Sequence, residues 1–232
     1  MNNSLADSKT LTRLLLICLA VILGLCLILG DGDDDATAVF NQVYAIKRVE
    51  TDENIYAVCA DCGRGTNVKD AVSLVNTATS LGIKICLFIS ADHAAFNSEE
   101  LRAVADKCEL GLLIEQDMSS TGKKEIMRTI AEYNEKIYES CGVYPRFVKY
   151  VGEDAPAVYE TVRAYGQYAV EGSRDSVSAG SVWSMGEVDS SSGRILTNTA
   201  AACAGSGLLP VSLGELLLDI DIQADMEGVQ RE

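Results

Sequence analysis

Short apolar runs that alternate with amphipathic segments constrain the fold of this chain most strongly. The run from Ile83 to Ile89 (IKICLFI) is nearly continuous and has the length of a strand buried on both faces of a parallel sheet. Before it, residues 67–82 begin at Asn67, a favourable N-cap, carry apolar residues at helical spacing and end at Gly82. A helix that leads into such a strand is typical of a βαβ unit, so we expect parallel strands.

The same alternation continues along the chain. The predicted strands are 55–59, 83–89, 109–114 and 147–151, with short candidates at 168–170, 181–183 and 194–197. The predicted helices are 67–82, one opened by Ser98, one ending at Gly142, one capped by Asp154 and one after the capping box Ser212-x-x-Glu215. The order predicts the α/β class, and about seven strands in about 180 residues fit either a closed or nearly closed barrel or a doubly wound open sheet.

Composition removes several classes of function. The chain has 19 Lys+Arg against 34 Asp+Glu, for a net charge of -15, so we expect no nucleic-acid partner because phosphate binding needs a basic face. It has one histidine, which excludes a Cys₂His₂ zinc finger and a three-histidine zinc site. A hydrophobic content of 48% is enough to bury a core.

An uncharged segment near the N-terminus predicts attachment to a membrane. Leu14–Gly30 would extend about 25 Å as a helix, somewhat less than the roughly 30 Å of a bilayer core. Lys9 and Arg13 precede it and acidic residues follow it, which favours an N-terminus inside and the remaining chain outside. We expect a single-pass signal anchor in the cytoplasmic membrane with an extracytoplasmic soluble domain. Cleavage after Ala36–Ala38 is the alternative, and a lipoprotein modification at Cys26 is disfavoured by the large residue before it.

Several motifs resemble those of the polysaccharide deacetylase (NodB homology) family. CADCG (Cys59–Gly63) occupies the place of the family's T-F-D-D-G, and LGIK (Leu81–Lys84) with LFI (Leu87–Ile89) occupies its second strand region. Later pieces follow in the family's order: KCELG (Lys107–Gly111), the helical stretch Lys124–Gly142, PRF (Pro145–Phe147) and GRIL (Gly193–Leu196). The lead-in Val43–Asn54 is similar to membrane-anchored deacetylases of spore-forming bacteria. The resemblance covers residues 43–220 and implies a NodB-type distorted (β/α) barrel.

The resemblance also implies a chemistry whose residues this chain largely lacks. The family holds a divalent metal such as zinc with one Asp and two His, and uses a second Asp as general base and a late His as general acid. Asp61 keeps the general-base position, whereas Cys62 replaces the metal-binding Asp. The histidine pair falls on Leu113 and Asp117, and the late histidine falls near Thr199. We therefore expect no metal cofactor, with an unusual three-ligand site of Asp61, Cys62 and Asp117 as the alternative.

Two further residues are candidates for substrate binding. Lys149 stands where the family has an arginine and is a candidate substrate-binding residue. Trp183 is a second candidate, because aromatic faces stack on sugars, although a lone Trp on a short strand is more often part of a core. His93 is predicted to be a surface loop residue, and Cys59-x-x-Cys62 is predicted to be structural rather than a redox or metal motif.

These observations predict four segments. They are a cytoplasmic tail with a transmembrane signal anchor (1–30), an acidic juxtamembrane spacer (31–42), a deacetylase-like domain (43–220) and a C-terminal tail (221–232). The predicted function is that of a catalytically inactive, membrane-anchored deacetylase-like protein of cell-wall carbohydrate metabolism or sporulation, which binds a cell-wall glycan or an envelope protein. The alternatives are a divergent metal-dependent carbohydrate deacetylase and a structural membrane-tethered interaction protein.

Overall fold

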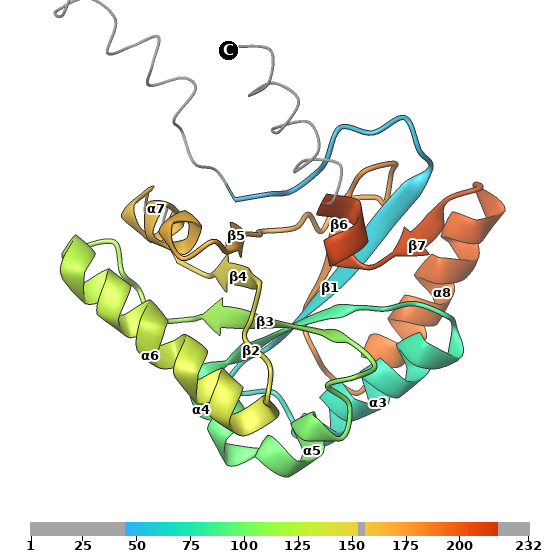
Figure 1. Ribbon diagram of the computed structural model, residues 1–232. Coiled ribbons are helices and arrows are strands. Elements are labelled where there is room, and N and C mark those ends of the chain that lie inside the picture. Colours follow the sequence, from blue (N-terminus) through green and yellow to red (C-terminus); the bar gives the residue numbers. More distant parts are fainter. Residues whose placement is uncertain (1–44, 153–155, 218–232) are drawn as a thin grey trace, which may run out of the picture. The chain divides into compact units, whose positions relative to one another are not determined.

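A computed structural model describes residues 45–152 and 156–217 (Figure 1). The predicted signal anchor, acidic spacer and C-terminal tail lie outside these residues, as does the predicted helix cap Asp154. Within the two ranges, no helix is long and apolar enough to cross a membrane.

The domain is built on one parallel sheet. Its strands are β1 (Ile55–Cys62), β2 (Cys86–Ser90), β3 (Glu109–Ile114), β4 (Phe147–Tyr150), β5 (Tyr168–Ala169), β6 (Val182–Glu187) and β7 (Leu209–Val211). The order across the sheet is β5-β4-β3-β2-β1-β6, β7 pairs with the start of β1, and every pair is parallel. The helices are α3 (Val68–Ser80), α4 (Ala91–Phe96), α5 (Ser98–Arg102), α6 (Lys123–Cys141), α7 (Pro156–Ala164) and α8 (Ser192–Gly205). The result is a parallel α/β half-barrel, as expected for the NodB-type fold.

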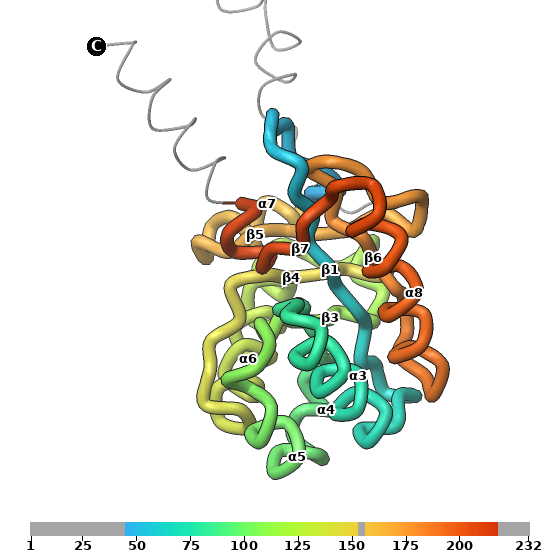
Figure 2. The backbone as a smooth tube through the Cα atoms, turned by 90° about the vertical axis from the view of Figure 1, so that its right-hand side faces the viewer, coloured from blue at the N-terminus to red at the C-terminus, as the bar shows by residue number. Residues whose placement is uncertain are grey.

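The alternation of side chains along β1 separates two cores. Successive residues of a strand point to opposite faces. Val58 and Cys62 belong to the outer core between the sheet and the helices, whereas Cys59 belongs to an inner core that also contains Phe88 and Leu113. In Figure 2, β1 runs through the centre of the domain between α6 and α8.

The inner core is closed at the N-terminal ends of the strands by the helical residues 213–217. Leu213, Leu216 and Leu217 pack into the inner core. The predicted capping box is confirmed, because Ser212 N–H donates to Glu215 at 2.8 Å and Glu215 N–H donates to the Ser212 hydroxyl at 3.2 Å. The other end of the half-barrel, at the C-terminal ends of the strands, is therefore the end available for a site.

Residues 46–49 close the gap between the two edges of the sheet. Ile46 bridges to Val170, directly after β5, and Arg48 bridges to Ser181, directly before β6. Val49 N–H donates to the Gly180 carbonyl at 2.8 Å. Gly180 has a φ of +73°, and a Cβ atom there would collide with the Val49 carbonyl oxygen. We refer to residues 46–49 as the seam segment.

Most predicted elements are confirmed, and three differ: α8 stands where a strand was predicted, and neither α4 nor β7 was predicted. The predicted strand at 194–197 is wrong, because these residues lie in α8, where Leu196 is buried and Ile195 is 44% exposed. The two apolar residues therefore lie on different sides of a helix, and the alanine-rich sequence after them favours that helix. The short helix α4 was not predicted, because it starts directly at the end of β2 without a loop.

Candidate functional site

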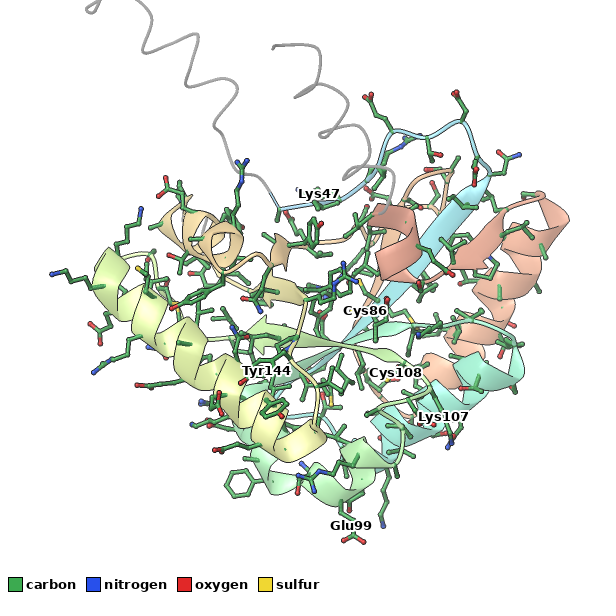
Figure 3. All side chains as sticks on the ribbon, in the orientation of Figure 1. Lys47, Cys86, Glu99, Lys107, Cys108 and Tyr144 are labelled. Atoms are coloured by element: carbon green, nitrogen blue, oxygen red, sulfur yellow. The ribbon has the colours of Figure 1, made fainter. Side chains whose placement is uncertain are left out.

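A cleft lies at the C-terminal ends of the strands, where sites form in parallel α/β folds. It has a volume of about 1170 Å³ and is lined by Asp61 of β1, Lys149 and Tyr150 of β4 and Ser184 of β6. The lining also includes Tyr159 of α7, residues 45–48, 151–152 and 171–175. Figure 3 shows Lys47 of the seam segment on the side of the domain opposite Glu99 of α5.

Asp61 and Lys149 form a buried ion pair on the floor of this cleft. The Lys149 ammonium donates to both carboxylate oxygens of Asp61 at 2.8 Å and to the Ser184 hydroxyl at 2.9 Å. The three residues are only 8%, 6% and 4% exposed. An ammonium has three N–H donors, so these three bonds satisfy it completely.

The curvature of the sheet brings this ion pair together. β1 and β4 are separated by β2 and β3 in the sheet, and Asp61 and Lys149 are 88 residues apart in the chain. Both side chains point to the inner face, where the Lys149 ammonium lies 5.9 Å from the centre of the Phe88 ring. In a flat sheet, two strands separated by two others would be roughly 14 Å apart, so the contact requires the half-barrel.

The residues at the expected metal positions do not fit a divalent metal. Cys62 points into the outer core, away from Asp61, and burial raises the pKa of its thiol to about 12, with a contribution from Glu115. Leu113 is an apolar side chain of the inner core. Asp117 is exposed, and its carboxylate accepts from Ser119 N–H at 2.9 Å. The alternative ligand set Asp61, Cys62 and Asp117 is therefore not assembled.

The other acidic, cysteine and histidine side chains of the described residues do not form a metal site either. Among residues 45–152 and 156–217, no group of three or more His, Cys, Asp or Glu side chains is arranged to hold a metal ion. The Asp117 carboxylate also accepts from the Tyr150 hydroxyl of β4 at 3.2 Å, but Asp117 itself does not line the cleft.

The predicted place of the late histidine is wrong. Thr199 lies on α8 beside a separate, smaller pocket that includes Val177 and Asn198. The strand that ends beside Asp61 is β6, since Asp61 pairs with Glu187 and the Lys149 ammonium binds Ser184. Sequence reasoning missed Ser184, although the short apolar run at 181–183 directly before it was predicted to be a strand.

Trp183 and His93 both lie outside the cleft. Trp183 is 9% exposed, belongs to the outer core and does not line the cleft. His93 is not in a surface loop but on α4, where it is 7% exposed and its Nε2 has no hydrogen-bond partner in the part of the chain that the structure describes. Burial lowers the pKa of His93, and the nearby Glu115 partly opposes this.

Comparison with known proteins identifies the fold. No family model matches the chain, and no curated protein matches it. Solved structures do match, and among them are family 4 carbohydrate esterases and CE4 family pseudoenzymes. The chain therefore has the fold of this class, which is the fold predicted from its motifs.

Three of these structures illustrate the similarity. A wild-type CE4 family pseudoenzyme from Bacillus anthracis is 12% identical, with a TM-score of 0.66 over 75% of this chain and 69% of its own. A peptidoglycan N-acetylglucosamine deacetylase is 14% identical, with a TM-score of 0.66 over 77% and 94%. PdaA, a family 4 carbohydrate esterase from Bacillus subtilis, is 11% identical, with a TM-score of 0.64 over 82% and 91%. At these identities the likeness is one of fold.

Proposed function

We propose that this chain is a non-catalytic, membrane-tethered relative of the family 4 carbohydrate esterases that binds a cell-envelope glycan in its cleft. The observation that carries the proposal is the ion pair between Asp61 and Lys149. A general base must take up a proton from the water or group that it deprotonates. Asp61 is instead the counter-charge of one buried ammonium, and taking up a proton would leave that ammonium buried and unpaired.

The metal positions support the same conclusion. Cys62 faces the outer core and Leu113 donates nothing, so the residues that the structure describes offer no set of ligands that would activate a water molecule beside Asp61. The alternative of a divergent metal-dependent deacetylase loses its support, because its three ligands do not converge.

The cleft itself supports glycan binding. Its volume of about 1170 Å³ exceeds the roughly 300–1,000 Å³ of ordinary small-molecule pockets. Tyr150 and Tyr159 line it together with several charged and hydroxyl side chains, which suits a polar ligand with apolar ring faces. Structures of similar fold include a peptidoglycan deacetylase and a pseudoenzyme. The uncharged segment Leu14–Gly30 supplies the proposed tether.

Binding of acetylated peptidoglycan glycan strands to the full chain, held in a polyoxyethylene detergent, tests this function. We expect saturable binding by isothermal titration calorimetry that Tyr159→Ala weakens about tenfold, because a stacking surface in the cleft is lost. Tyr138→Ala is the matched control, since Tyr138 is exposed on α6 and does not line the cleft. If neither the full chain nor the Tyr138→Ala variant binds glycan, the chain is a structural interaction protein instead.

A further inference from the structure

The charges that line the cleft are unlike those of the rest of the chain. The lining contains four basic residues and three acidic ones, in a chain whose net charge is -15. The lining charges are Lys47, Arg48, Lys149 and Arg174 against Asp61, Glu171 and Asp175. The cleft is therefore a small region of net positive charge on an acidic protein, and such a region attracts anions.

Two guanidinium groups of the cleft lining have no ion-pair partner within residues 45–152 and 156–217. Lys149 is paired with Asp61, and Lys47 is paired with Glu171 at 3.1 Å. Neither Arg48 nor Arg174 forms an ion pair or a side-chain hydrogen bond with any residue that the structure describes. The remaining carboxylate, that of Asp175, is bound within its own turn.

The Asp175 carboxylate accepts from the Ser173 hydroxyl at 2.8 Å, and Asp175 N–H donates back to the same hydroxyl at 3.0 Å. These local bonds orient it toward Ser173. The two arginines are thus the charged side chains of the lining that have no partner of their own in the described residues.

The Arg174 guanidinium lies against the backbone at the end of β6. Gly186 has a φ of +75°, and a Cβ atom there would lie 2.7 Å from Arg174 Nη2 and 3.0 Å from its Cζ. The guanidinium is therefore next to β6, two residues beyond Ser184, while the Arg174 side chain remains exposed.

Arg48 approaches the same cleft from the seam segment. Its backbone is fixed by the bridge to Ser181, while its side chain is exposed. Two guanidinium groups that come from different segments and line one cleft suit a carboxylate or a phosphate, since the planar fork of donors matches both anions.

We propose that the glycan recognised by this cleft is anionic, and that Arg174 and Arg48 bind its carboxylate or phosphate groups. This inference rests on the proposed function, because it specifies the chemical class of the glycan. The Asp61–Lys149 pair forms the floor of the site and takes no direct part in holding the anion, because all three ammonium donors of Lys149 are already used.

The test compares three probes on the full chain in a polyoxyethylene detergent at low salt. The first is a peptide-free strand of alternating N-acetylglucosamine and N-acetylmuramic acid, which bears carboxylates. The second is the same strand with its carboxylates converted to amides, and the third is a sugar polymer joined by phosphodiester groups. We expect at least one anionic probe to bind about tenfold or more tightly than the amidated strand, and its identity distinguishes carboxylate from phosphate.

Arg174→Ala and Arg48→Ala should each weaken binding of the preferred anionic probe about tenfold, while Arg194→Ala should leave it unchanged. Arg194 is an exposed arginine of α8 outside the cleft, so its removal alters the net charge equally. Equal binding of charged and amidated strands, or equal affinities of the three variants, would overturn the anionic inference and leave glycan binding intact. Failure of all three probes to bind would overturn the proposed function together with the inference.

Discussion

At the scale of single residues, the site is defined by one lysine. Lys149 occupies a position where the resemblance to deacetylases suggested a basic residue, and it satisfies the one acidic residue that the catalytic motifs retain. A buried ion pair contributes little net stability when intact, but loss of one partner leaves the other charge buried and unpaired. This asymmetry gives the first prediction.

Lys149→Met should lower the free energy of unfolding by about 3–5 kcal/mol, because Asp61 then remains buried without its counter-charge. The double variant Asp61→Leu/Lys149→Met should recover most of this loss, since it removes both charges. Urea denaturation of the full chain measures both effects.

The matched control is Lys123→Met. Lys123 pairs with Glu160 at 2.9 Å, but their side chains are 62% and 51% exposed, so the expected loss is below about 1 kcal/mol. Equal losses in Lys149→Met and Lys123→Met would show that the buried pair does not exist in solution.

His93 gives a second prediction, because it is the one histidine of the chain. Burial lowers its pKa in the folded state, so between that value and the unfolded value of about 6.5 the unfolded chain binds more protons. Stability should therefore fall as the pH drops below about 6.5, and His93→Gln should remove this component. Proton NMR of the full chain provides the direct reading, and a His93 ring signal that titrates above 6.5 would contradict the burial of this residue.

At the scale of secondary-structure elements, the seam segment decides whether the half-barrel closes. It joins the two edges of the sheet through isolated bridges, and backbone hydrogen bonds link it to residues 169–182, among them the bond from Val49 N–H to the Gly180 carbonyl. Its close contact with Gly180 is therefore a sensitive point for a substitution.

Gly180→Ala should destabilise the domain more than Gly142→Ala does. Both glycines have positive φ, +73° and +77°, so both variants incur the cost of about 1–2 kcal/mol for a left-handed alanine. A Cβ at Gly142, which ends α6, has nothing within 4 Å, whereas a Cβ at Gly180 collides with the Val49 carbonyl oxygen. Denaturation midpoints measure the difference, and equal losses would mean that the seam segment does not pack at Gly180.

The sequence predicted helices correctly where apolar residues recur at helical spacing and a capping residue or glycine marks the end of the helix. Asn67 caps α3 by accepting from Lys69 N–H at 3.0 Å, and Gly142 ends α6 with positive φ, both as predicted. Prediction failed at α8, where two adjacent apolar residues suggested a strand. It also failed at α4, a helix of six residues that is too short to show a period.

Only part of the site could be predicted from the sequence, and its spatial arrangement could not. Asp61 and Lys149 were each identified through the resemblance to deacetylases, yet their pairing depends on the curvature of a sheet in which two strands separate them. Ser184 was missed because the final motif was placed on 193–196 rather than on β6. Such contacts cannot be predicted from local sequence patterns, because they depend on packing across the whole sheet.

At the scale of the whole molecule, the fold is that of family 4 carbohydrate esterases while the chemistry of its cleft differs from the family's. The strands that would present metal ligands instead present Cys62 to the outer core and Leu113 to the inner core. The charge of the cleft also differs from that of the chain as a whole, since Arg48 and Arg174 line the cleft of a strongly acidic protein and have no ion-pair partner among the described residues. A preserved fold with an altered cleft is what we expect of a binding protein that shares its architecture with enzymes.

Release of acetate from acetylated peptidoglycan strands tests the central claim most directly. The full chain is incubated with the strands in the presence of zinc, and acetate is quantified alongside binding to the same strands. We predict that the wild-type chain binds the strands and releases no acetate. Acetate release by the wild-type chain would contradict the central claim, because the cleft would then catalyse deacetylation despite the pairing of Asp61 with Lys149.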